Sequence, residues 1–274
     1  MVNKINFLAK IPNILIKNPQ RNIHLAKCLQ SEHGNSGFLD KVFGNKIEKA
    51  TNAHSVLLAN QQVLYELEIH NVKPECAAEY EKTCEGNVPA LLEKNKDLMK
   101  LAGGWKSEIG ALDQYVHLWR YKNYTDYSEV FTRLRKDDLN LKFKNQVAKL
   151  VNRRETQVCL SFTYWGEPES RQEDHIYEMR SYALKPGSLI EWGNNWSRGI
   201  KNRLEYRCAG MFTQVGPIYH VHHIWAYKDL ASRKESREKM WNKPGWDECV
   251  AYTVPLIRKM DSKIMTALPY SPTK

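Results

Sequence analysis

The sequence predicts an α+β fold: two tandem ferredoxin-like βαββαβ repeats whose sheets close against each other into a barrel within one chain. Three observations indicate this fold: an internal repeat, the same order of strand and helix periods in both copies, and a sheet face that the helices leave uncovered. We place the first repeat at residues 61–170 and the second at 171–274, behind a leader (1–31) and a linker (32–60).

The internal repeat is visible as two sets of matched residues. Near the start of each copy, Tyr65-Glu66 and Tyr177-Glu178 are each followed by a Lys-Pro pair, at a shift of 112 residues. Further along the shift is 106 residues, and one copy's His117, Trp119 and Tyr121 match His223, Trp225 and Tyr227 of the other. Because tryptophan is rare, two matched tryptophan contexts in one register indicate a duplication.

The residue periods give both repeats the same order of elements. In the first repeat, alternating residues predict strands at 65–71, 101–109, 113–121 and 156–164, and helical stripes follow Pro74 and cover 143–151. In the second repeat, we expect strands at 177–184, 208–215, 218–227 and 263–268, with helices after Pro186 and over 246–260. A proline at the first position of a helix costs little, because its missing N–H would be unbonded there anyway.

Alternation in the matched strands separates bulky from smaller residues. In QYVHLWRY (114–121), the aromatic residues and His117 share one face, and the matched strand repeats this arrangement around His223. We expect this bulky face, with the two glutamates, to line a pocket inside the barrel: Glu66, Tyr115, His117, Trp119, Tyr121, Glu178, Val221, His223, Trp225 and Tyr227. A carboxylate beside an imidazole can serve acid–base chemistry or ligand recognition. The same residues can equally be packing between the repeats, and both interpretations stay open.

The charge is concentrated at the start of the chain. There are 41 Lys and Arg against 31 Asp and Glu, a formal net charge of +10, and residues 1–31 hold five of the cations and no acid. A basic, acid-free leader with interspersed apolar residues is typical of a mitochondrial transit peptide, which implies the import machinery as a partner and a location in the mitochondrial matrix. Because the leader accounts for half of the excess charge, nucleic acid is not an expected partner.

Familiar catalytic and metal-binding motifs are absent from the sequence. It contains no GxGxxG, GxxxxGK[ST], HExxH or GxSxG pattern, so we predict no catalytic residue, no cofactor and no metal site. The six cysteines show no CxxC spacing, which favours reduced thiols over disulfides or structural zinc. No run of about 18 apolar residues is present, so no transmembrane segment is expected.

Several longer strings resemble the NipSnap family. They are EWGNNW (191–196), VHHIWAYKDL (221–230) and GWDECVAYTVPLI (245–257), together with NVKPEC (71–76) and QYVHLWRY (114–121) in the first repeat. The resemblance covers residues 60–274 and implies a tandem dimeric α/β-barrel located in mitochondria. It also implies a non-enzymatic adaptor role in mitophagy, in which the protein, exposed on depolarised mitochondria, recruits autophagy receptors and Atg8-like proteins. Whether two chains form a homodimer stays open.

Two functions of different class follow. The preferred one is the adaptor, because a leader is present and catalytic motifs are missing. The alternative is a small-molecule or haem-binding α/β-barrel enzyme of the monooxygenase-like type, which rests on fold analogy and on His117 and His223. A filled barrel centre favours the adaptor, and a cavity lined by both histidines favours the enzyme.

Overall fold

The computed structural model describes residues 63–274, so the predicted leader (1–31) and linker (32–60) lie outside the described residues. The first repeat runs β1 (Leu64–Val72), α3 (Ala77–Asn95), β2 (Met99–Ile109), β3 (Gln114–Tyr121), α4 (Tyr124–Leu134), α5 (Asp138–Leu150) and β4 (Val151–Ser161). The second repeat runs β5 (Ile176–Leu184), α6 (Leu189–Gly199), β6 (Arg207–Val215), β7 (His220–Tyr227), α7 (Leu230–Trp241), α8 (Trp246–Thr253) and β8 (Ile257–Ala267). Short 3₁₀ turns occupy Pro74–Cys76, Ile200–Tyr206 and Val254–Leu256.

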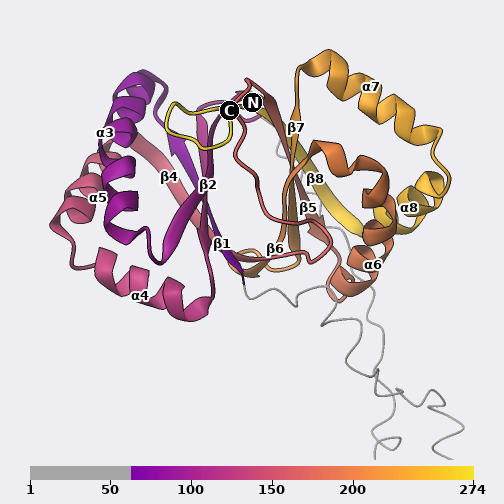
Figure 1. Cartoon of the computed structure of the whole chain (residues 1–274), viewed down its shortest axis with the longest axis horizontal. Coiled ribbons are helices and arrows are strands. Elements are labelled where there is room, and N and C mark those ends of the chain that lie inside the picture. Colours follow the sequence, from indigo (N-terminus) through magenta and orange to yellow (C-terminus); the bar gives the residue numbers. More distant parts are fainter. Residues whose placement is uncertain (1–62) are drawn as a thin grey trace, which may run out of the picture. The chain divides into compact units, whose positions relative to one another are not determined.

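The strands form one closed antiparallel barrel in the order β1-β3-β2-β8-β5-β7-β6-β4. Each repeat supplies a ferredoxin-like sheet, and the two sheets join where β2 pairs with β8 and where β4 pairs with β6. Figure 1 shows α3, α4 and α5 outside one sheet, and α6, α7 and α8 outside the other. The predicted fold, two βαββαβ repeats closed into one barrel, is confirmed.

The helices differ from the sequence prediction in number and in where they begin. Between the third and fourth strands of each repeat there are two helices instead of one. Short polar side chains begin them: Asn123 caps α4, Asp137 caps α5, and Asp229 caps α7 by accepting a hydrogen bond from a backbone N–H in the first turn. Pro74 lies in a 3₁₀ turn before α3, and Pro186 precedes the first residue of α6 by three positions.

The duplication extends to the backbone of the two hairpins that join β2 to β3 and β6 to β7. Gly110 and Gly216, which occupy matched positions, have φ angles of 107° and 114°. Three residues later, Asp113 and Tyr219 have φ angles of 59° and 61°. A positive φ at the first position is accessible to glycine at little cost, so the glycine is what both turns require. The two hairpins therefore use the same turn in spite of different sequences.

The apolar core has three parts. One lies inside the barrel, and the other two lie outside it, each between one sheet and the helices that cover that sheet. The interior part draws on both repeats: Tyr65, Leu67, Trp105, Val116, Leu118, Cys159, Tyr177, Met179, Cys208, Ala209, Met211, Ile224, Ala226 and Met265. These side chains are at most 3% exposed, so they fill the centre of the barrel.

Candidate functional site

The predicted pocket residues form two separate groups, one in each repeat, and neither group faces the barrel interior. Tyr115, Trp119 and Tyr121 pack under α3, α4 and α5, while Val221, Trp225 and Tyr227 pack under the helices of the second repeat. The glutamates and histidines share these faces, as their contacts below show. The prediction that this face points into the barrel is therefore wrong.

The reason is that both faces of these strands are buried. The alternation of residues divides β3 and β7 into two faces. It does not show which face points into the barrel, because neither face is exposed to solvent. An eight-stranded barrel has an interior just wide enough for side chains to fill. It takes the smaller apolar residues of these strands, Val116, Leu118, Ile224 and Ala226, and the bulky rings occupy the wider layers beneath the helices.

The two matched histidines lie opposite matched glycines. His117 pairs in register with Gly104 of β2, and His223 pairs with Gly210 of β6. An aromatic ring stacks on each histidine from the segment that ends the other repeat. Trp165, which follows β4, lies with its ring centroid 4.3 Å from that of His223, and Tyr270, which follows β8, lies 5.9 Å from His117. Each repeat is thus completed by the end of the other.

The first repeat gathers Glu66, Glu68, His70 and His117 beneath its helices, a set we call the carboxylate–histidine cluster. Glu68 is at its centre: a carboxylate oxygen lies 3.0 Å from His70 Nε2, and the other accepts a hydrogen bond from Trp119 Nε1 at 3.0 Å. Burial alone would raise the pKa of Glu68, but the neighbouring His70 lowers it below the usual value. Burial lowers the pKa of His117 to about 4, so this imidazole is neutral at pH 7.

Glu66 behaves differently from its neighbour. Burial and then the charge of Glu68 raise the pKa of Glu66 to about 7, although Tyr121 donates a hydrogen bond to its carboxylate at 2.7 Å. Glu66 lines two adjoining hollows of about 100 and 320 Å³. A carboxyl group that titrates near neutral pH beside a cavity is able to bind and release a proton. This is the chemistry that the cluster offers.

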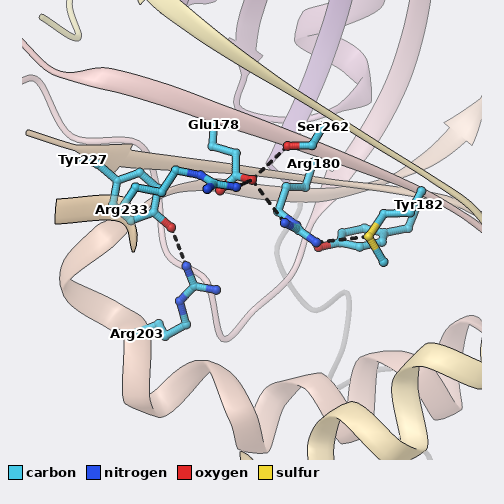
Figure 2. Close-up of polar contacts among 8 residues, drawn as sticks. Glu178, Arg180, Tyr182, Arg203, Tyr227, Arg233 and Ser262 are labelled. Atoms are coloured by element: carbon cyan, nitrogen blue, oxygen red, sulfur yellow. Dashed lines mark hydrogen bonds and ion pairs between the residues drawn. The ribbon is translucent and has the colours of Figure 1, made fainter. Parts of the chain in front are cut away.

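The second repeat has an arginine, Arg180, at the position that matches Glu68 of the first repeat, and a tyrosine, Tyr182, at the position that matches His70. Glu178 is fully buried and accepts hydrogen bonds from Arg180 (3.1 Å), Arg233 (2.6 Å) and Ser262 (2.9 Å), as Figure 2 shows. Burial alone would raise the pKa of Glu178, but Arg233 and Arg180 lower it to about 2. The guanidinium of Arg203 binds the hydroxyl of Tyr227 and lies 4.1 Å from the ring centroid of Trp225.

Next to Glu178 is a cavity of about 180 Å³ that we call the arginine–tryptophan pocket. Its walls include Arg180, Arg203 and Arg237 with Trp192, Trp196 and Trp246. Fully buried His223 stacks against Trp165 and Trp196 nearby. Burial lowers the pKa of His223 well below the usual value, and neither of its ring nitrogens has a hydrogen-bond partner among the described residues.

Some of these residues were not predicted as site residues. The i, i+4 spacing of Trp192 and Trp196 marks a buried helix face, but it does not distinguish packing from a pocket. One face of α7 carries Arg233, Arg237 and Met240 at positions i, i+4 and i+7. This spacing was the sequence signal for a face in contact with the rest of the protein, although the other residues of the helix are typical of a solvent-exposed helix. No signal of this kind exists for Arg203, because it lies in a 3₁₀ turn.

Comparison with known proteins agrees with the duplication. The NIPSNAP family model matches residues 65–164 and again residues 177–272. The chain is similar to human NipSnap homolog 2, with 43% identity over 240 residues that cover 86% of this chain and 84% of the relative. It is also similar to NipSnap of Drosophila melanogaster, with 37% identity over 97% of this chain and 100% of the relative.

Solved structures with low sequence identity share the fold of this chain, and the similarity extends to the fold only. A monooxygenase-like protein of Fusobacterium nucleatum superimposes with a TM-score of 0.55 at 12% identity, covering 77% of this chain and 98% of its own. A similar protein of Lactobacillus acidophilus gives a TM-score of 0.54 at 10% identity, with the same coverage. None of the helices in residues 63–274 is both long and apolar enough to cross a membrane. With its two copies of the family's domain and its close relatives, the chain belongs to the NIPSNAP family.

Proposed function

We propose that this chain is a mitochondrial adaptor in mitophagy. In this role it acts without catalysis and recruits autophagy receptors and Atg8-like proteins to damaged mitochondria. The observation that carries the proposal is the similarity to NipSnap homologs 1 and 2 at about 43% identity over 86% of the chain. Similarity over nearly the whole chain supports a shared role for the whole protein and not for one module of it.

The geometry of the barrel supports the adaptor over the enzyme alternative. That alternative required a ligand site between the two sheets, lined by His117 and His223. Apolar side chains fill this space, and the two histidines lie outside it, in separate layers under different helices. The basis for a shared pocket of the two histidines is therefore lost.

The targeting part of the proposal is tested by imaging the full chain and a variant without residues 1–31. We expect the full chain to accumulate in mitochondria and the shortened one to spread through the cytosol. A matched control keeps the leader but replaces its five cations, Lys4, Lys10, Lys17, Arg21 and Lys27, with glutamine. It should fail like the deletion, because import depends on positive charge. Unchanged accumulation of the deletion would contradict mitochondrial targeting by this segment.

The adaptor part is tested by capturing the tagged full chain from cells before and after mitochondrial depolarisation. We expect autophagy receptors and Atg8-like proteins to co-purify in larger amounts after depolarisation. A His223→Phe variant serves as the control, because His223 is fully buried and cannot contact a partner protein directly. Equal capture before and after depolarisation, or loss of capture in this buried variant at normal protein levels, would argue against a surface-based adaptor.

A further inference from the structure

The arginine–tryptophan pocket carries more positive charge than its surroundings balance. Arg180, Arg203 and Arg237 line it, and no carboxylate does. The neighbouring Glu178 is already shared between Arg180 and Arg233. Arg237 is half-buried and has no hydrogen-bond or ion-pair partner among residues 63–274. Placing a guanidinium in an apolar layer is costly unless a counter-charge pairs with it.

Some residues that line the pocket also carry hydrogen-bond donors without good acceptors. The indole N–H groups of Trp192 and Trp196 and the Nε–H of Arg203 are buried and unpartnered in the described structure. These residues are at most 7% exposed. The Nη2 group of Arg180 contacts only the sulfur of Met260, at 3.1 Å, and a thioether is a weak acceptor. Of these donors, Arg180 Nη2 is the one paired only with a weak acceptor, and it can donate to a carboxylate oxygen instead.

The remaining walls are apolar and aromatic. They include Trp246, Met240, Val250 and Ile257, with the Thr253 hydroxyl as a polar exception, and Trp241 in the same lining is 63% exposed. A cavity of about 180 Å³ is close in size to one of roughly 150 Å³ that holds a benzene ring, so a single aromatic ring fits it. Flat indole rings favour a flat partner, which can stack or meet them edge to face.

We propose that the arginine–tryptophan pocket binds a small aromatic carboxylate, with the carboxylate on Arg237 and Arg180 and the ring among the tryptophans. The planar guanidinium matches a carboxylate with two parallel hydrogen bonds. A monoanion fits better than a phosphate dianion, because desolvating a double charge in this apolar layer costs more. The proposal concerns ligand binding and does not depend on the adaptor role.

The first repeat provides an internal comparison. Glu68 occupies the position that matches Arg180, and His70 matches Tyr182. The hollow beneath the first set of helices is lined by Glu66 and Glu68 as well as Lys144 and Arg154, so it has no excess of positive charge to bind an anion. One ligand per chain is expected, although the two repeats share a fold.

Isothermal titration of the full chain tests the proposal with three probes of similar shape: phenylacetate, phenyl phosphate and the neutral 2-phenylethanol. We expect phenylacetate to bind once per chain, more tightly than either other probe, and to quench tryptophan fluorescence. Arg237→Gln should weaken binding about 10-fold or more, since a hydrogen bond to a charged group is removed. Arg237→Lys, which keeps the charge but loses the planar fork, should bind with intermediate affinity.

Arg258→Gln is the matched control, because Arg258 is an exposed arginine of β8 outside the pocket. It should bind phenylacetate like the unchanged chain. Thermal unfolding of each variant shows whether it is folded, and Arg237 is exposed enough for the variant to remain so. The proposal is overturned if no probe binds at millimolar concentration, if 2-phenylethanol binds as tightly as phenylacetate, or if Arg258→Gln weakens binding as much as Arg237→Gln. Tighter binding of phenyl phosphate would overturn the carboxylate assignment.

Discussion

Trp165 stacks on His223 with ring centroids 4.3 Å apart and an angle of 29° between the rings, although the two residues belong to different repeats. Trp165 follows the last strand of the first repeat, and His223 lies in the middle of the second. The backbone beside them is glycine: a Cβ on Gly210 would lie 2.2 Å from the Trp165 ring. The contact between the two repeats therefore requires glycine at position 210, because any side chain there would overlap the Trp165 ring.

Gly210→Ala should lower the free energy of unfolding by about 1–3 kcal/mol, the usual cost of overpacking a core. The matched Gly104→Ala is the control, because its Cβ would meet its nearest atom, in His117, at 3.4 Å, which is ordinary contact. We expect a loss of less than about 1 kcal/mol there. Urea denaturation compares the two, and equal losses would show that the Trp165 contact is not what requires Gly210.

His223→Phe should leave the free energy of unfolding unchanged or raise it. Both ring nitrogens of His223 are buried without partners, so removing them discards an unsatisfied polar group. His117→Phe should lower the stability by about 1–3 kcal/mol, because it leaves the Tyr270 hydroxyl without its partner at 2.7 Å. Denaturation curves at pH 7 measure both. A larger loss for His223→Phe than for His117→Phe would contradict this difference between the repeats.

Glu66→Gln should raise the free energy of unfolding above that of the unchanged chain at pH 8, and should change it little at pH 4.5. The pKa of Glu66 is raised to about 7 in the folded state from 4.5, so the folded state holds an extra proton between these values. Stability from this group therefore falls as pH rises through that window, by about 3 kcal/mol in total. Glutamine stays neutral and avoids this loss.

The comparison must be a difference between the variant and the unchanged chain at each pH. The buried His117, whose pKa is lowered to about 4, contributes the opposite trend, with stability lost as pH falls below 6.5. Subtracting the two unfolding curves cancels this contribution. A difference that does not change from pH 4.5 to pH 8 would show that Glu66 is ionised normally.

Glu178→Gln should lower the stability by about 3–5 kcal/mol at pH 7, because it leaves Arg180 and Arg233 facing each other without their carboxylate. The folded-state pKa of about 2 means that this stability is present above pH 4.5 and is lost as pH falls toward 2. The difference should therefore shrink in acid. Glu129→Gln, which breaks an exposed pair with Arg133, is the control and should cost less than about 1 kcal/mol.

The fold could be predicted because the duplication is visible in the sequence itself. Matched positions such as His117 and His223 align the two repeats and show that their elements follow in the same order. The direction of the strand faces could not be predicted. Alternation along β3 separates Val116 from His117, but with both faces buried only the width of the barrel decides which points inward. The pocket arginines were missed for two reasons. Arg203 lies in a 3₁₀ turn and has no local spacing signal, and the i, i+4, i+7 spacing of Arg237 with Arg233 and Met240 does not show that this face of α7 meets the tryptophans.

The reciprocal completion of the two repeats is tested most directly by hydrogen exchange on Tyr270→Ala and Trp165→Ala. Tyr270 ends the second repeat but covers His117 of the first, so Tyr270→Ala should speed exchange in β2 and β3 and leave β6 and β7 unchanged. Trp165→Ala should do the reverse, speeding exchange in β6 and β7 only. Faster exchange confined to the repeat that carries each substituted residue would contradict the account.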